Sequence, residues 1–278
     1  MDSDRRIEDS MSEESVDGRI RQGTPAPLAG GVMSAATKVG QTVRRSASPS
    51  WPAVHALLTH LRRTGFTQVP EPMGVDENGR EILSFIDGRA GHPPITPEIA
   101  SDDALRAAAT AIRDFHDATV GFSAHGWSTN AADPLGPAEV ICHNDLAPFN
   151  LIYRGRSIAA IIDWDGAAPG RRVWDLAYAA WRLVPLHRPE YASPLGWPDL
   201  DRSARLAAFA DAYRMSAEIR HDLIDTIRER QTQTVSAMAE LAKQGTIRAL
   251  PESDPRAESG DIRYFDLHEA AWNKAVNP

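Results

Sequence analysis

The sequence predicts an α+β fold in two lobes, a small sheet-rich lobe over residues 25–87 and a mostly helical lobe over residues 88–278. Short runs with strand character, separated by glycine turns, fill much of the first range. Apolar residues at helical spacing dominate the second range. A turn-rich segment from Asp87 to Pro97 separates the two patterns and is the expected linker.

The small lobe begins after a stretch that we do not expect to fold. Residues 1–24 are polar, charged and nearly free of aromatic side chains, so they cannot bury enough apolar surface, and we expect a disordered tail. Two short strands are expected around Gly40, and a turn over residues 76–79 should precede a strand over residues 81–86. A helix is expected over residues 51–63. Its signals are a capping serine, an early proline, four apolar residues at helical spacing and a terminal glycine, at Ser50, Pro52, Val54, Leu57, Leu58, Leu61 and Gly65.

The second lobe carries helical patterns over residues 104–118, 174–183 and 203–245. Between the first two lie a short apolar strand over residues 139–142 and a hairpin over residues 151–162. The apolar positions expected to face the core of these helices are Leu105, Ala108, Ile112, Phe115, Leu206, Phe209, Tyr213, Leu223, Ile227, Met238 and Leu241.

Composition excludes several classes of function. The net charge of -8 argues against a nucleic-acid footprint, which needs clustered basic residues. No window reaches the roughly 18 apolar residues of a membrane span, and the N-terminus lacks the apolar core of a signal peptide. Cys142 is the only cysteine, so no intrachain disulfide is possible. We therefore expect a cytoplasmic protein, a monomer or homodimer, with no membrane or nucleic-acid partner.

The most informative stretch directly follows the strand that ends at Cys142. It reads His143-Asn-Asp145-Leu-Ala-Pro-Phe-Asn150, and the apolar run Ile-Ile ends at Asp163-Trp-Asp165 thirteen residues later. In a kinase-type site an aspartate orients the acceptor hydroxyl and accepts its proton, an asparagine five residues on holds magnesium, and a downstream aspartate completes the metal site. The spacing therefore predicts Asp145 as the catalytic residue and Asn150 and Asp163 as ligands of Mg²⁺.

These motifs resemble those of the aminoglycoside phosphotransferase and choline kinase-like superfamily, whose members are relatives of the protein kinases. The resemblance runs from about Leu28 to Val184 and includes the segments 115–119, 168–170 and 174–178. It implies a two-lobed protein kinase-like fold, with Asp175 bracing the catalytic loop and His143 in structural support. The sequence around His143 is similar to that of a bacterial branch of this superfamily. Some members of the branch are labelled as giving immunity to the peptide antibiotic trifolitoxin.

The nucleotide lobe departs from the kinase pattern. Kinase-like folds hold the α- and β-phosphates with a strand lysine paired to a helix glutamate. Arg44 is the expected equivalent of the lysine, and helix 51–63 offers no glutamate at the matching position, where Val54 or His55 falls. Gly30 and Gly31 are the expected phosphate-covering turn. The nucleotide base is expected against the linker near Ser84 and Ile86.

Simpler explanations remain open for several of these residues. Asp145 and Asn150 could be turn residues, and Asp163 could cap a helix. Asp165 fits a solvated or supporting role better than direct metal contact. Arg44 could be a solvated strand arginine, and Gly30-Gly31 an ordinary turn. Cys142 is expected to be a buried strand thiol.

The sequence thus predicts transfer of the γ-phosphoryl group of ATP or GTP, with Mg²⁺, to a hydroxyl of a small molecule such as an aminoglycoside-like antibiotic or a metabolite. The alternative is a nucleotide-binding pseudokinase or immunity-type binding protein without turnover. A protein kinase is disfavoured because only a short stretch separates Asp163 from Gly170, which leaves no room for an activation loop. Transfer of a nucleotidyl group stays open.

Overall fold

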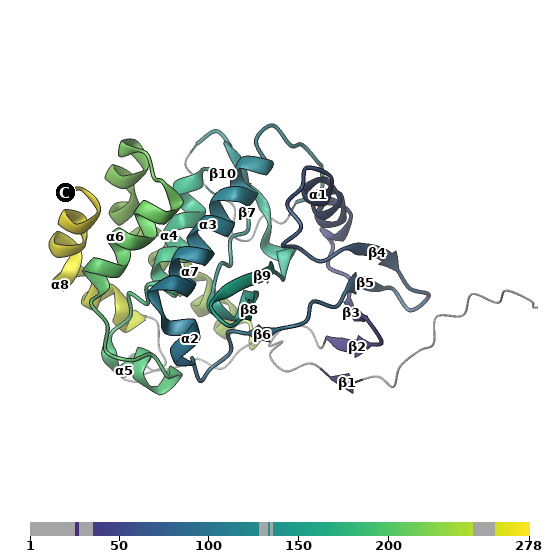
Figure 1. The fold of residues 1–278 in the computed structure, drawn as a ribbon, viewed down its shortest axis with the longest axis horizontal. Coiled ribbons are helices and arrows are strands. Elements are labelled where there is room, and N and C mark those ends of the chain that lie inside the picture. The colour runs from purple at the N-terminus through teal and green to yellow at the C-terminus, as the bar shows by residue number, and fades with distance from the viewer. Residues whose placement is uncertain (1–25, 28–35, 128–132, 134–135, 247–258) are drawn as a thin grey trace, which may run out of the picture.

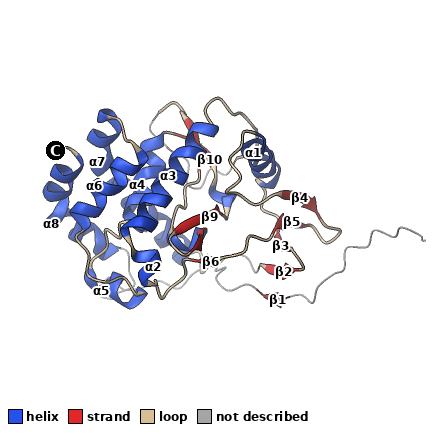
Figure 2. Ribbon diagram, in the orientation of Figure 1, coloured by secondary structure: helices blue, strands red, loops and turns tan. Residues whose placement is uncertain are grey.

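A computed structural model of the chain describes residues 26–27, 36–127, 133, 136–246 and 259–278. The predicted tail over residues 1–24 and the predicted turn at Gly30-Gly31 lie outside these residues. Figure 1 shows a strand-rich part with one helix beside a larger helical part, and Figure 2 shows the same view with helices in blue and strands in red. The predicted α+β class is confirmed.

The strand-rich part is an antiparallel sheet with the order β1-β2-β3-β5-β4. Its strands are β1 (Ala26–Pro27), β2 (Thr37–Val39), β3 (Thr42–Ser46), β4 (Pro72–Val75) and β5 (Arg80–Ser84). Gly40 makes the β2–β3 turn at a φ of 61°, a conformation that glycine adopts without strain. The register places Arg45 of β3 directly opposite Glu81 of β5.

Helix α1 (Trp51–Arg63) lies next to this sheet, with the predicted bounds. Its four predicted core residues are all buried, so the apolar stripe does face the core. Ser50 holds the N-cap position but makes no side-chain cap bond. Its hydroxyl instead lies 3.1 Å from the Ser48 hydroxyl and 3.4 Å from the Asp165 carbonyl oxygen, which links the helix start to the second lobe.

The chain leaves the sheet through Asp87 and Gly88 and then joins a second small sheet, ordered β6-β8-β9. Its strands are β6 (Arg89–Ala90), β8 (Leu151–Arg154) and β9 (Ser157–Ile161), and the predicted hairpin is confirmed by β8 and β9. A third, two-stranded sheet pairs β7 (Val140–Cys142) with β10 (Ala168–Gly170). These short strands fix both ends of the segment that carries the predicted catalytic residues.

The remaining elements are helical and pack around α3 and α4 (Figure 1). The helices are α2 (Pro97–Ala100), α3 (Asp102–Ala118), α4 (Arg172–Leu183), α5 (Pro189–Ala192), α6 (Arg202–Tyr213), α7 (Ala217–Lys243) and α8 (Ser259–Val276), with 3₁₀ turns η1 (Pro148–Asn150), η2 (Trp164–Gly166) and η3 (Ser193–Leu195). None of the described helices is long and apolar enough to cross a membrane.

The predicted helical segment 203–245 is two helices, because Arg214 adopts a left-handed conformation with a φ of 61° and ends α6. Leu223 and Ile227 of α7 are buried as expected. Met238 is 45% exposed, so its predicted place in the core was wrong. The second half of α7 extends past the body of the lobe, and its apolar spacing there does not mark a buried face.

The linker glycine is expected to be indispensable. Gly88 has a φ of +145°, and a Cβ added there would lie 2.5 Å from Ile152 Cγ2 and 2.8 Å from the Tyr153 carbonyl oxygen. Gly88→Ala should therefore lower the free energy of unfolding by about 3–4 kcal/mol in urea denaturation. Gly155→Ala is the matched control, because Gly155 also has a positive φ but has nothing within 4 Å of the added Cβ. It should cost about 1 kcal/mol, and equal losses would contradict the steric argument.

Candidate active site

The loop from His143 to Ala147 is held by a buried carboxylate. Asp175, on the first turn of α4, is fully buried and accepts hydrogen bonds from the backbone N–H groups of His143 and Asn144, both at 2.8 Å. Asn144 has a φ of 68°, a left-handed conformation that asparagine tolerates better than most residues. Its side-chain amide donates to the Gly166 carbonyl oxygen at 2.9 Å. The loop conformation is therefore fixed from two sides.

His143 ties the loop to the segment that carries Asp163. Its Nδ1 accepts from the Asp145 backbone N–H at 3.2 Å, and its Nε2 lies 2.9 Å from the Ile162 carbonyl oxygen, to which it donates. The ring is fully buried and packs edge-on against Trp164, with centroids 4.7 Å apart. This placement matches the supporting role expected of His143 and leaves neither ring nitrogen to act as a base.

Asp145 presents its carboxylate between two donors. The Asn150 side-chain amide donates to Asp145 Oδ2 at 2.8 Å and to its backbone carbonyl oxygen at 2.8 Å, and the Tyr178 hydroxyl donates to Oδ1 at 2.8 Å. Burial raises the pKa of the Asp145 carboxyl, and the Tyr178 hydrogen bond opposes that rise. Because the Asn150 amide nitrogen is used in both of its bonds, its amide oxygen is the atom left to meet a metal ion.

Asp163 follows β9 in a left-handed conformation with a φ of 64°, and its side chain is 46% exposed. It stands at the N-cap position of η2 but makes no side-chain cap bond, so the structure gives no support to a capping role. One carboxylate oxygen lies 2.6 Å from Arg45 Nη1. The backbone joins it to Asn150, because the Ile162 N–H donates to the Asn150 carbonyl oxygen at 2.9 Å.

Arg45 of β3 lies at the centre of a cluster of charged side chains. Its guanidinium contacts three carboxylates: Asp163, Asp165 at 2.7 Å, and Glu81, the residue opposite it in the sheet. Burial by itself lowers the pKa of Arg45, but the three negative charges outweigh it, so the pKa is raised. The other oxygen of Glu81 lies 3.1 Å from His55 Nε2 on α1. A strand acid and a helix histidine thus stand where the kinase pattern has a helix glutamate.

Arg44, the predicted phosphate contact, turns away from this cluster. Its Nη1 lies 3.4 Å from Asp76 Oδ2, in the turn between β4 and β5. Successive side chains of a strand point to opposite faces, so only one of two adjacent arginines can reach Asp163. That arginine is Arg45.

The donor set fits a divalent cation bound together with phosphates. Three carboxylates around one guanidinium leave a formal charge of -2 beside Asn150. Within the described part of the chain no three His, Cys, Asp or Glu side chains form a cage of their own. Magnesium in nucleotide sites needs only one or two carboxylates, because phosphate and water oxygens supply the other ligands.

The backbone of the predicted base-binding segment is partly hydrogen-bonded to the neighbouring segments of the sheet. The Ser84 N–H donates to the Glu71 carbonyl oxygen at 2.9 Å, and the Phe85 N–H donates to Gln41 at 2.8 Å. For Ile86 no backbone hydrogen bond is found among the described residues. Ser84 is tied further by its hydroxyl, which accepts from the Glu71 N–H at 2.8 Å.

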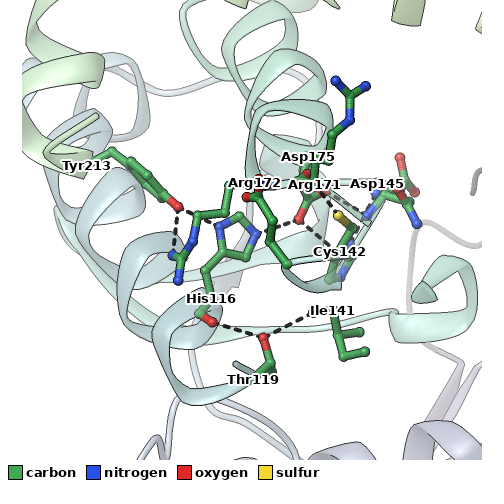
Figure 3. A network of polar contacts seen from close by, with 12 residues as sticks. His116, Thr119, Ile141, Cys142, Asp145, Arg171, Arg172, Asp175 and Tyr213 are labelled. Carbon is green, nitrogen blue, oxygen red and sulfur yellow. Dashed lines mark hydrogen bonds and ion pairs between the residues drawn. The ribbon is translucent and has the colours of Figure 1, made fainter. Parts of the chain in front are cut away.

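A series of hydrogen bonds leads from Arg172 through Tyr213 and His116 to the Asp175 carboxylate (Figure 3). Arg172 Nη1 donates to the Tyr213 hydroxyl oxygen at 3.1 Å, that hydroxyl lies 2.8 Å from His116 Nδ1, and His116 Nε2 lies 3.1 Å from Asp175 Oδ2. These hydrogen bonds are satisfied by a neutral imidazole that accepts at Nδ1 and donates at Nε2. Burial lowers the pKa of His116, which agrees with that form.

The Cys142 thiol lies beside these hydrogen-bonded residues, and its surroundings do not favour a nucleophilic role. The thiol is fully buried and donates to the Arg171 carbonyl oxygen at 3.3 Å. Burial raises its pKa well above the usual range, so it stays protonated, as expected of a strand thiol.

Comparison with known proteins agrees with this geometry. The sequence pattern of the phosphotransferase enzyme family matches residues 127–213, which hold the catalytic loop, Asp163 and Asp175. A trifolitoxin immunity protein from Rhizobium leguminosarum bv. trifolii is 32% identical over 234 residues, 82% of this chain and 86% of that protein. The chain belongs to the phosphotransferase enzyme family.

Solved structures place this phosphotransferase family member among kinase-like folds. An amicoumacin kinase superposes with a TM-score of 0.65 at 13% identity, over 88% of this chain and 87% of that one. A choline/ethanolamine kinase family protein from Mesorhizobium loti gives 0.59 at 15% identity, over 91% and 92%. Spectinomycin phosphotransferase gives 0.59 at 12% identity, over 92% and 94%. At these identities the likeness shows the fold alone, and the predicted two-lobed kinase-like fold is confirmed.

Three site residues escaped the sequence analysis. Arg45 was hidden by its neighbour Arg44, although the alternation of β3 against the apolar residues of β5 could have separated them. Glu81 directly precedes the apolar residues Ile82 and Leu83 of β5, and a lone acid at such a place is a usable signal of a buried partner. Tyr178 stands three residues after Asp175, so helical spacing puts it on the same face as the loop brace.

Removing the central guanidinium should destabilise the fold. Arg45→Met leaves the buried Glu81 and two further carboxylates without their counter-charge, so the free energy of unfolding should fall by about 3 kcal/mol in urea titration. Arg44→Met is the control, because its pair with Asp76 is long and partly exposed and should contribute under about 1 kcal/mol. A larger loss for Arg44→Met would show that the wrong arginine has been placed at the centre.

The neutral state of His116 makes stability depend on pH. Its folded pKa lies below the ordinary value of about 6.5, so below that pH the unfolded chain takes up a proton that the native chain does not. The free energy of unfolding should therefore fall by up to about 1.4 kcal/mol per pH unit as the pH drops from about 6.5. Asp175, whose pKa is also lowered in the fold, adds a further loss below about pH 4.

Urea titration at several pH values checks this dependence. His116→Gln should be less stable at pH 7 but should lose less on acidification than the native chain. His221→Gln, at an exposed position of α7, should leave the slope unchanged. An unaltered slope in His116→Gln would mean that another group takes up the proton.

Proposed function

We propose that this phosphotransferase family member moves the γ-phosphoryl group of ATP or GTP to a hydroxyl of a small molecule. The observation that carries the proposal is the fixed carboxylate of Asp145, hydrogen-bonded to Asn150 and joined through the loop and β9 to Asp163. Phosphoryl transfer asks the protein for positioning and charge neutralisation, and this arrangement offers both.

Asp145 orients the acceptor hydroxyl and accepts its proton. As the acceptor oxygen forms its bond to the γ-phosphorus, the bond from that phosphorus to the β,γ-bridging oxygen breaks and the nucleoside diphosphate leaves. The hydroxyl proton passes to the Asp145 carboxylate. Burial of this carboxyl raises its pKa, which makes it a better proton acceptor than a solvated aspartate.

Asn150 and Asp163 are the proposed ligands of Mg²⁺, through the amide oxygen and the carboxylate. When bound, the ion supplies charge neutralisation to the phosphate oxygens. The formal charge of -2 around Arg45 supports a divalent cation at this place. Asp165, whose carboxylate is held by Arg45 as that of Asp163 is, keeps its proposed supporting role.

Nucleotide contacts are proposed for Arg45 and for the backbone of Ile86. Arg45 replaces the predicted Arg44, because its guanidinium lies at the metal carboxylate and a guanidinium binds phosphate with two parallel hydrogen bonds. Ile86 offers its backbone groups to the base, while the Ser84 amide is already used within the sheet. The predicted roles of Gly30 and Gly31 fall outside the described residues.

The proposed acceptor is a small antibiotic or metabolite that carries a hydroxyl group. The fold neighbours include kinases named for amicoumacin, for choline and ethanolamine, and for spectinomycin, all of them small molecules. A cytoplasmic location would supply the nucleotide.

A second candidate is an immunity protein that binds its target without turnover. The 32% identity to a trifolitoxin immunity protein favours it, as does the absence of a lysine and a helix glutamate from the Arg45 cluster. A pure binder has no need of Asp145, Asn150 and Asp163 together, which is why we place catalysis first.

Substitution of Asp145 tests the catalytic proposal. Asp145→Ala should lower magnesium-dependent consumption of ATP or GTP over an acceptor panel by roughly 100- to 10,000-fold, because the proton acceptor is lost. Nucleotides with magnesium should still raise the melting temperature of the variant, since binding does not require this carboxylate. Asp199→Asn, in an exposed loop, is the control and should retain full activity.

Mass spectrometry of the product identifies the group transferred. An acceptor heavier by one phosphate supports the proposal, and a nucleotidyl adduct contradicts it. Nucleotide binding without turnover across the panel would favour the immunity-type binder, and unchanged turnover in Asp145→Ala would remove Asp145 from the chemistry.

A further inference from the structure

Helix α4 contacts the predicted catalytic loop through two side chains, those of Asp175 and Tyr178. Asp175 holds the backbone of the loop through two amide groups. Tyr178, three residues further along the same helix, reaches the Asp145 side chain itself, with its hydroxyl 2.8 Å from Oδ1. Residues three apart lie on one face of a helix, so both contacts follow from one orientation of α4.

The two side chains that donate hydrogen bonds to the Asp145 carboxylate lie on different elements of the fold. Asn150, on η1, donates to Oδ2, and Tyr178, on α4, donates to Oδ1, both at 2.8 Å. One donor would leave the carboxylate free to rotate about its Cβ–Cγ bond, whereas one donor on each oxygen fixes its plane. An ionised carboxylate has about four acceptor sites, so each oxygen keeps a lone pair for a hydroxyl group of the substrate.

Tyr178 is itself held rigidly. Its side chain is 7% exposed, and the guanidinium of Arg230 lies over its ring at 4.9 Å and over the Trp174 ring at 4.6 Å. Arg230 also donates from Nη2 to the Asn144 carbonyl oxygen at 2.8 Å. Helix α7 therefore supports both the loop and the tyrosine that contacts its aspartate. A catalytic group must be held within about 0.5 Å of its productive position, and this packing provides such support.

We propose that Tyr178 is a positioning residue for phosphoryl transfer, which holds the Asp145 carboxylate in the orientation that receives the acceptor hydroxyl. The inference rests on the proposed function, because it assigns Tyr178 a part in that reaction. Because its hydroxyl contacts the carboxylate that receives the acceptor proton, we expect Tyr178 to act on the rate of the chemical step and not on nucleotide affinity.

Tyr178→Phe removes the hydroxyl and keeps the ring against the Arg230 guanidinium. It should lower kcat by roughly 10- to 100-fold, the effect of losing one hydrogen bond to a charged group. The KM for the nucleotide and the nucleotide-dependent rise in melting temperature should stay unchanged. Tyr264→Phe is the matched control on α8, because it makes the same chemical change far from the loop, and its kcat should equal that of the native chain.

A contact that serves only to fasten α4 to the loop would give a different result. Tyr178→Phe would then lose nucleotide binding and turnover together, or would turn over normally. Either outcome overturns the positioning role. A fall in kcat with nucleotide binding preserved supports it, whether or not the lost hydrogen bond also lowers the melting temperature.

A double-mutant cycle separates this inference from the proposed function. Urea unfolding of the native chain, Tyr178→Phe, Asp145→Ala and the double variant measures whether the two side chains are coupled, without any need for turnover. Additive effects overturn the inference even in an active enzyme. Coupling in a native chain that transfers no phosphate to any acceptor overturns the proposed function, and the role of Tyr178 in catalysis falls with it.

Discussion

Every part of the site depends on the buried carboxylate of Asp175. It accepts two backbone N–H groups of the catalytic loop and faces the imidazole of His116, all without exposure to water. Burying a carboxylate is costly unless its lone pairs are satisfied, and here they are satisfied by the loop itself. The left-handed turn at Asn144 and the position of Asp145 therefore follow from the same interaction that makes the buried charge tolerable.

The second constraint is the excess of negative charge around Arg45. Its guanidinium contacts three carboxylates that come from β5 and from the segment after β9. The pair of Arg45 with Glu81 is set by strand register, whereas the lysine–glutamate pair of the kinase pattern joins a strand to a helix. With the acid on the sheet, α1 contributes His55, whose Nε2 lies 3.1 Å from the other oxygen of Glu81. The formal charge of -2 that remains favours a divalent cation beside these carboxylates.

The sequence predicted the fold class and the catalytic loop because both are encoded locally. The spacing of His143, Asp145 and Asn150 lies within one loop, and the hairpin that follows has an unambiguous turn. Arg45 and Tyr178 were not assigned, because alternation and helical spacing show which residues share a face but not which distant segment that face contacts. The choice between Arg44 and Arg45 depends on which face of β3 meets the second lobe, and the exposure of Met238 depends on where α7 outgrows its neighbours. The local sequence pattern indicates neither the face of β3 that meets the second lobe nor the part of α7 that is exposed.

We propose that Asp145, Asn150, Asp163 and Arg45 form one nucleotide–metal site. A crystal structure with Mg²⁺ and a non-hydrolysable ATP analogue would show whether they do. We expect a metal ion about 2.1 Å from the Asn150 amide oxygen and from an Asp163 carboxylate oxygen, with Arg45 on a phosphate and the γ-phosphate facing Asp145. A nucleotide bound elsewhere, or bound with its metal ion away from Asn150 and Asp163, would contradict it.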